Sequence, residues 1–146
     1  MVHRNFQSTQ DMVNNLLEMA SRLDVLERLL AADSADILGP APNLLVLHFQ
    51  LNQLESFRNQ TMHQAKKSSP SSKTTLTRWF ERLNNVLAAF EQYLLDLARN
   101  ILGIVRAGHP HVVVRLIKIA EMEGKEDEKV RQNSSFAICH LFIALS

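Results

Sequence analysis

The apolar residues between Thr75 and Arg106 follow one another at alternating intervals of four and three residues. This spacing is the a/d pattern of a heptad repeat, and it predicts a long helix with one continuous apolar edge. We call this edge the seam; its members are Leu76, Phe80, Leu83, Leu87, Phe90, Leu94, Leu97, Ile101 and Ile104. A second set, Trp79, Val86 and Tyr93, repeats every seven residues beside it. Because the apolar face is this wide, it predicts more than one neighbouring helix.

A helix over this range is long for a chain of 146 residues. It would measure about 50 Å, whereas a compact globule of this chain length has a diameter of about 40 Å. The pattern therefore predicts an all-α fold, in which long heptad-patterned helices form an elongated coiled coil or helical bundle.

Two earlier helices show similar spacing. The first is expected from about Ser8 to Ala32, with Ser8 or Thr9 as its N-cap. Its apolar positions are Met12, Leu16, Met19, Leu23, Leu26 and Leu30. The sequence Gly39-Pro40-Ala41-Pro42 prevents its continuation, since proline lacks an amide donor and restricts the preceding residue. The second helix is expected from about Asn43 to Ala65, with an apolar edge of Leu44, Leu47, Leu51, Leu54, Phe57 and Met62.

Polar residues separate the second helix from the long one. The segment Lys66–Lys73 has no apolar period and predicts an exposed, flexible loop, after which Thr74 or Thr75 caps the long helix. Gly108 suits the left-handed position after a helix, and Pro110 suits the first turn of a fourth helix. The apolar face expected for that fourth helix is Val113, Leu116, Ile117 and Ala120.

Composition agrees with this interpretation and excludes several classes of protein. Glycine and proline are scarce, with four of each, and the net charge is +1, so neither nucleic acid nor an anionic membrane is an expected partner. A single cysteine, Cys139, excludes an internal disulfide and fits a reducing compartment. The N-terminus lacks the apolar core of a signal peptide, and no apolar run is long enough for a transmembrane segment. We expect a soluble, intracellular protein.

No group of residues predicts catalysis, a cofactor or a metal site, so we expect a protein that is not an enzyme. His109 and His111 lie close together, but the sequence supplies no further ligands beside them. We interpret His48 as a boundary residue of the second helix, and Cys139 as an apolar filler without an activating partner. The aromatic residues at helical spacing are interpreted as core rather than as a ligand site: Trp79, Phe80 and Phe90.

Four longer segments of the sequence carry a family resemblance. They are NLLVLHFQLNQLESFRNQTM at 43–62, LARNILGIVRAG at 97–108, VVVRLIKIAE at 112–121 and KEDEK at 125–129. In these segments the chain resembles the N-terminal region of the fungal Sec-six subunit of the exocyst (exocyst complex component three), and the resemblance extends over about residues 8 to 131.

This resemblance implies a segment of an eight-subunit complex that tethers secretory vesicles at the plasma membrane before exocytosis. Subunits of that complex are helical rods that pair with one another through long helices. The implied partners are other exocyst subunits, through coiled-coil pairing, and SNARE proteins. The implied location is cytoplasmic and peripheral to the plasma membrane at sites of polarised secretion. On this view the seam is the partner-packing surface, with Leu83, Leu87, Phe90, Leu94, Leu97 and Ile101 as its main residues.

The need to bury the seam does not by itself require another protein, so an alternative to partner binding stays open. Its apolar side chains are satisfied equally well inside a self-contained antiparallel bundle, which would act as a generic interaction or structural module. Such a protein would be monomeric, would melt cooperatively and would expose little apolar surface.

The character of the sequence changes after Gln132, so we expect two regions. The resemblance implies that residues 1–132 are the N-terminal coiled-coil helical region of an exocyst subunit, and we expect residues 133–146 to be an aberrant apolar tail of unknown role. A family member is several times longer and would continue here with a charged amphipathic helix. We interpret the tail as translated intron, frameshifted sequence or a truncated gene model.

This interpretation predicts a discontinuity in the coding sequence at the Gln132 codon. Sequencing the mature transcript across that codon is expected to reveal a retained intron or a shift of frame. An uninterrupted reading frame in mature message would refute it.

Overall fold

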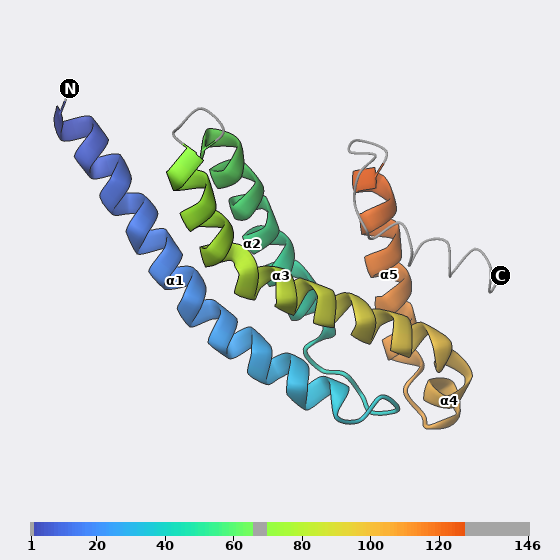
Figure 1. The fold of residues 1–146 in the computed structure, drawn as a ribbon. Coiled ribbons are helices and arrows are strands. Elements are labelled where there is room, and N and C mark those ends of the chain that lie inside the picture. The colour runs from blue at the N-terminus through green and yellow to red at the C-terminus, as the bar shows by residue number, and fades with distance from the viewer. Residues whose placement is uncertain (1, 66–69, 128–146) are drawn as a thin grey trace.

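A computed structural model describes residues 2–65 and 70–127, and every regular element over these ranges is a helix. The helices are α1 (Val2–Ser34), α2 (Leu44–Ala65), α3 (Pro70–Arg99), α4 (Ile101–Arg106) and α5 (Pro110–Asp127). Figure 1 shows α1, α2 and α3 running together as long rods, whereas α5 stands to one side near α4. The all-α helical bundle expected from the sequence is confirmed.

α3 is the central helix of the bundle. It packs against α1, α2, α4 and α5, whereas α1 contacts only α2 and α3 among the described helices. The wide apolar face of α3 predicted more than one neighbouring helix, and this prediction is confirmed.

The core is one cluster, to which all five described helices contribute apolar side chains. The expected edge of α1 is buried from Leu16 to Leu30, and that of α2 from Leu44 to Leu54, while Phe57 and Met62 are partly buried. The most deeply buried large side chains are Leu23, Leu44, Leu47, Leu51, Phe80, Leu83, Leu94, Leu97, Ile104, Leu116 and Ile119. Full burial of one such side chain contributes about 1.5–3 kcal/mol.

Two helices begin earlier than the sequence predicted. α1 starts at Val2, so Ser8 and Thr9 lie inside the helix and do not cap it. α3 starts at Pro70, so the predicted loop is shortened and Thr74 and Thr75 are helical. Proline fits the first helical turn, where its missing amide would have no intrahelical partner. The remaining loop residues, 66–69, lie outside the described ranges.

The predicted helix from Thr75 to Arg106 is interrupted at Asn100. α3 ends one residue before it and α4 begins one residue after it. The amide of Asn100 donates to the carbonyl oxygen of Leu97 at 3.1 Å, which tightens the last turn. Its side-chain amide donates to the carbonyl oxygen of Asp96 at 2.7 Å, a local bond that competes with the helical backbone. The prediction of one continuous helix is therefore wrong, because apolar spacing records burial and not backbone continuity.

The junction of α4 and α5 follows the sequence closely. Gly108 has a φ of 90°, the left-handed conformation expected there. Its amide donates to the carbonyl oxygen of Val105 at 3.1 Å, and the amide of His109 donates to that of Ile104 at 3.1 Å. These two bonds form a Schellman motif, which satisfies carbonyl groups that the helix end leaves open. Pro110 then starts α5 as predicted.

The apolar face of α5 differs in part from the expected one. Its fully buried residues are Val112, Leu116 and Ile119, with Val113 and Ala120 partly buried. Ile117 is 43% exposed, so its assignment to the apolar face is wrong. The buried residues of α5 are still spaced four and three apart. The buried face therefore includes Val112 and Ile119 in place of Ile117, and it shares Leu116 with the predicted face.

A buried carboxylate joins the end of α1 to the start of α2. Asp33, 5% exposed, accepts hydrogen bonds from the backbone amide of Asn43 at 3.0 Å and from its side-chain Nδ2 at 3.1 Å. The carboxylate therefore lies at the positive N-terminal end of α2, where a negative charge is favourable. Burial raises the pKa of the Tyr93 phenol above its ordinary value, and the charge of Asp33 raises it further.

Replacing Asp33 with alanine is expected to destabilise the bundle by about 1–3 kcal/mol, because two partly buried donors of Asn43 lose a charged acceptor. Asp36→Ala is the matched control, since Asp36 is an exposed carboxylate in the same connection, and its effect should stay within about 0.5 kcal/mol. Urea unfolding followed by circular dichroism measures both. Equal midpoints for the two variants would contradict a capping role for Asp33.

Candidate interaction surfaces

The seam lies mostly inside the bundle. Seven of its nine members are buried: Leu76, Phe80, Leu83, Phe90, Leu94, Leu97 and Ile104. The other two, Leu87 and Ile101, are partly buried. In the second set Val86 and Tyr93 are buried, whereas Trp79 is 45% exposed, so its interpretation as a core residue is wrong, while that of Phe80 and Phe90 is confirmed. The described chain therefore already covers most of the seam, and Leu87, Ile101 and Trp79 are its accessible margins.

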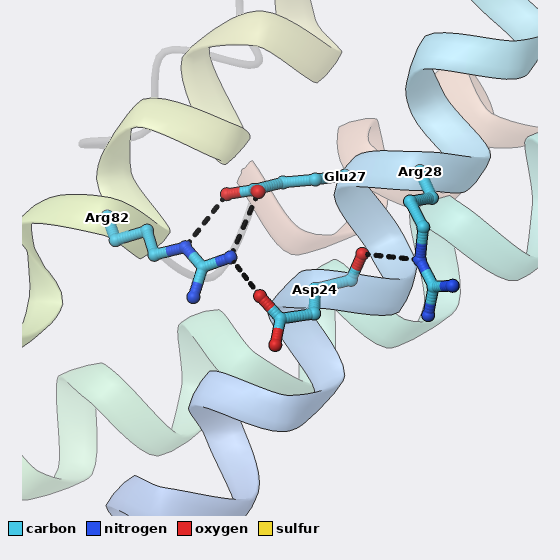
Figure 2. Close-up of polar contacts among 4 residues, drawn as sticks. All are labelled: Asp24, Glu27, Arg28 and Arg82. Atoms are coloured by element: carbon cyan, nitrogen blue, oxygen red, sulfur yellow. Dashed lines mark hydrogen bonds and ion pairs between the residues drawn. The ribbon is translucent and has the colours of Figure 1, made fainter.

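An ion-pair cluster joins α1 to α3 on the bundle surface. Figure 2 shows the Arg82 guanidinium between the carboxylates of Asp24 and Glu27, while Arg28 points to a backbone oxygen. Nε of Arg82 donates to Glu27 Oε1 at 2.9 Å, its Nη2 donates to Glu27 Oε2 at 3.0 Å, and Nη2 also donates to Asp24. Hydrogen bonding from Arg82 holds the pKa of the Glu27 carboxyl below its ordinary value. The cluster bridges α1 and α3 at the water-exposed edge of their contact.

A buried polar pair lies where α2 meets α5. Nε2 of His48 is 3.7 Å from Oε1 of Glu123, and the Asn52 amide nitrogen is 3.2 Å from the same ring nitrogen. His48 is 4% exposed, so its assignment as a boundary residue is wrong: the helix that covers it, α5, is distant in sequence. Within the described residues, Oε2 of Glu123 is buried without a hydrogen-bond partner.

The two histidines beside Pro110 contact each other and the preceding loop. The rings of His109 and His111 meet edge to face with centroids 5.5 Å apart, and Nε2 of His111 is 3.3 Å from the carbonyl oxygen of Pro40. Over the ranges 2–65 and 70–127, no three His, Cys, Asp or Glu residues come together to hold a metal ion. Cys139, expected as an apolar filler, lies outside these ranges.

Apolar residues remain exposed on each of the described helices. The most exposed are Leu102 at 72%, Val114 at 60%, Phe49 at 59% and Leu17 at 56%. Others are Val13, Val25, Leu38, Leu45, Val46, Trp79, Val105, Ile117 and Met122. Phe49, Leu45 and Met122 border a single groove between α2 and α5. Among the helices of the described ranges, none has the length and apolar character that crossing a membrane requires.

The contacts between helices were not found from the sequence. Asp24, Glu27 and Arg82 each belong to an ordinary polar face, and the same is true of Glu123. Their pairing depends on which helices become neighbours, and a single sequence carries no signal for that.

Removing the Arg82 side chain is expected to lower the free energy of unfolding by less than about 1 kcal/mol, because the cluster is exposed to water. The pKa of Glu27 is lowered by folding, so this stabilisation is complete above the ordinary value of 4.5 and is lost as the pH falls through the lower folded value. Urea midpoints of wild type and Arg82→Ala should therefore differ at pH 7 and converge in acid. Arg28→Ala, whose side chain reaches a backbone oxygen of its own helix, is the control; an equal loss there would contradict the bridging role.

Comparison with known proteins supports the family resemblance. Residues 80–140 match the family described as Exocyst complex component Sec6, so the match extends beyond residue 132 into the apolar tail. The chain is 31% identical over 131 residues to exocyst complex component sec6 of Schizosaccharomyces pombe, covering 89% of this chain and 17% of that protein. It is 26% identical over 131 residues to exocyst complex component SEC6 of Saccharomyces cerevisiae, covering 88% of this chain and 16% of that protein. No solved structure matches the chain.

The chain thus spans about one sixth of the length of these curated relatives, and each match covers nearly nine tenths of the chain itself. The resemblance inferred from its sequence is confirmed: the chain is similar to exocyst complex component Sec6 proteins over nearly nine tenths of its own length.

Proposed function

We propose that this chain is a segment of an exocyst subunit that serves vesicle tethering in exocytosis by packing its helices against those of other subunits. The observation that carries the proposal is the similarity to two exocyst components over nearly the whole chain. The all-α architecture supports it, because a bundle of long helices offers extended apolar edges and few polar clusters for chemistry.

The margin of the seam is the proposed contact surface. Leu87 and Ile101 are only partly buried and lie on the same edge as the buried core of α3 and α4. A partner that packs on this margin would bury both side chains. Since a stable interface needs more area than two side chains supply, the exposed Trp79 ring would extend the contact along α3.

The chain would then have a role that involves no catalysis, and it would be located with the complex. It would act as a non-enzymatic component, held at the cytoplasmic side of the plasma membrane at sites of polarised secretion through the assembled complex. SNARE binding stays a prediction from the family resemblance, since neither relative's name specifies a SNARE.

A second candidate is a self-contained bundle that serves as a structural or generic interaction module. The burial of seven seam residues within the chain favours it, because an apolar edge that is already covered has no need of a partner.

Leu87→Glu is expected to reduce recovery of other exocyst subunits at least tenfold, which corresponds to about 1.4 kcal/mol of binding free energy. The full-length subunit carrying the substitution would be purified from fungal cells and its bound subunits quantified. Leu95→Glu is the matched control, because Leu95 is also a partly buried leucine of α3 but lies outside the seam. Both variants introduce the same charge into the same helix.

Thermal melting of the isolated chain separates folding from binding. Similar melting of the two variants with loss of subunits only for Leu87→Glu supports the proposed contact. Unchanged recovery for both variants, with a monomeric and cooperatively melting chain, supports the self-contained bundle. A loss of subunits that follows the loss of stability equally in both variants would refute a specific seam contact.

A further inference from the structure

Exposed apolar and basic side chains follow the same order on α4 and on α5. In each helix two aliphatic residues three positions apart are followed directly by a basic residue. Because positions three and four residues apart share one side of a helix, each group forms a stripe. All six side chains are exposed. We call them the outer face: Leu102, Val105 and Arg106 on α4, and Val114, Ile117 and Lys118 on α5.

The two stripes point away from the core. Leu102 is two residues from Ile104, and Val114 is two residues from Leu116; Ile104 and Leu116 are fully buried. A separation of two residues is about 200° around a helix, so each stripe lies opposite the buried side of its helix. α4 and α5 pack against each other, and Figure 1 shows α4 and the start of α5 at the end of the molecule farthest from the N-terminus.

The connection between α1 and α2 holds this end of the molecule in place. Leu38 packs on α4 at Gly103, where an added Cβ would lie 3.0 Å from Leu38 Cδ2. On α5, Nη1 of Arg115 donates to the carbonyl oxygen of Ala41 at 3.5 Å. Since a third segment contacts both helices, the outer face is a defined surface and not a frayed helix end.

The charge around the outer face is of one sign. Residues 97–120 contain four basic residues and no acidic residue. The acidic residues that flank this range are Asp96, which is 3.8 Å from Arg99, and Glu121. Over the ranges 2–65 and 70–127, neither Arg106 nor Lys118 forms an ion pair. Unpaired cations beside exposed aliphatic side chains favour an occupant that brings carboxylates.

The aliphatic character of the outer face favours a protein over a lipid bilayer. Residues 97–120 contain no Phe, Trp or Tyr, whereas surfaces at a membrane interface are typically rich in Trp and Tyr. Recognition of anionic lipid also typically uses a cluster of about four to eight basic residues, and the outer face has Arg106 and Lys118. Rows of aliphatic side chains along a helix instead form ridges that fit the grooves of a second helix.

From these observations we propose that the outer face of α4 and α5 binds an amphipathic helix of another protein, whose apolar stripe is bordered by acidic residues. The apolar side chains of that helix cover Leu102 and Val114, and its carboxylates pair with Arg106 and Lys118. The outer face shares no residue with the seam, so this inference does not rest on the proposed contact at Leu87.

Two labelled peptides of about three heptads, both with leucine at positions a and d, serve as probes. One carries glutamate at positions e and g, and the other carries lysine there. Fluorescence anisotropy with the full chain is expected to show binding of the glutamate peptide, about tenfold or more tighter than binding of the lysine peptide. Added salt should weaken this binding, because exposed charges are screened.

Variants then locate the binding site. Leu102→Glu should weaken binding of the glutamate peptide by about tenfold, because it removes an apolar contact and adds a like charge. Leu17→Glu, at a leucine that is 56% exposed on α1, is the matched control and should leave the affinity unchanged. The double variant Arg106→Glu, Lys118→Glu should reverse the preference and bind the lysine peptide more tightly. Arg78→Glu, at an exposed arginine of α3, should not.

Several results would overturn the proposal. They are no binding of the glutamate peptide, equal binding of the two peptides, or equal losses for Leu102→Glu and Leu17→Glu. Cosedimentation with vesicles of phosphatidylcholine and phosphatidylserine that Leu102→Glu abolishes, without binding of the glutamate peptide, would assign the outer face to a membrane. A dimer detected by light scattering and dissociated by Leu102→Glu would assign it to a second copy of this chain. Circular dichroism of each variant confirms that the bundle remains folded.

Discussion

α3 touches every other described helix because its apolar face is wider than a single neighbouring helix can bury. α1 and α2 cover one part of this surface, and α4 and α5 pack against another part. The positions of the polar contacts follow from this arrangement. Arg82 meets Asp24 and Glu27 because α1 already lies on α3, and His48 meets Glu123 because α5 already lies on α2.

Local rules account for the elements that the sequence predicted well. The apolar edge of α1, the glycine with positive φ at 108 and the proline that starts α5 each depend on residues within a turn or two. The contacts missed by sequence reasoning join distant positions: Asp33 with Asn43 across a loop, and Arg82 with Glu27 across two helices. Single-sequence patterns identify which side chains need burial or charge partners. The partner itself is determined by tertiary packing.

The interruption at Asn100 shows a related limit. The seam residues on both sides keep their spacing and their burial, with Leu97 and Ile104 both fully enclosed. The hydrophobic pattern is preserved because the chain changes direction at a residue outside the seam, where an asparagine side chain binds a backbone carbonyl. Heptad spacing therefore describes a continuous buried surface, and the backbone beneath it can be made of two helices.

The candidate interaction surface depends on the same need for burial. A heptad edge specifies that leucines need apolar neighbours, and helices of the same chain are present at a far higher effective concentration than those of a partner. An edge with enough neighbours inside its own chain is therefore covered first from within, and most of the seam is. What stays accessible is the remainder, and on α3 and α4 that remainder includes the margin at Leu87 and Ile101 and the ring of Trp79. A helical bundle can thus bury most of a heptad edge within its own chain and still leave a narrow apolar margin in contact with water.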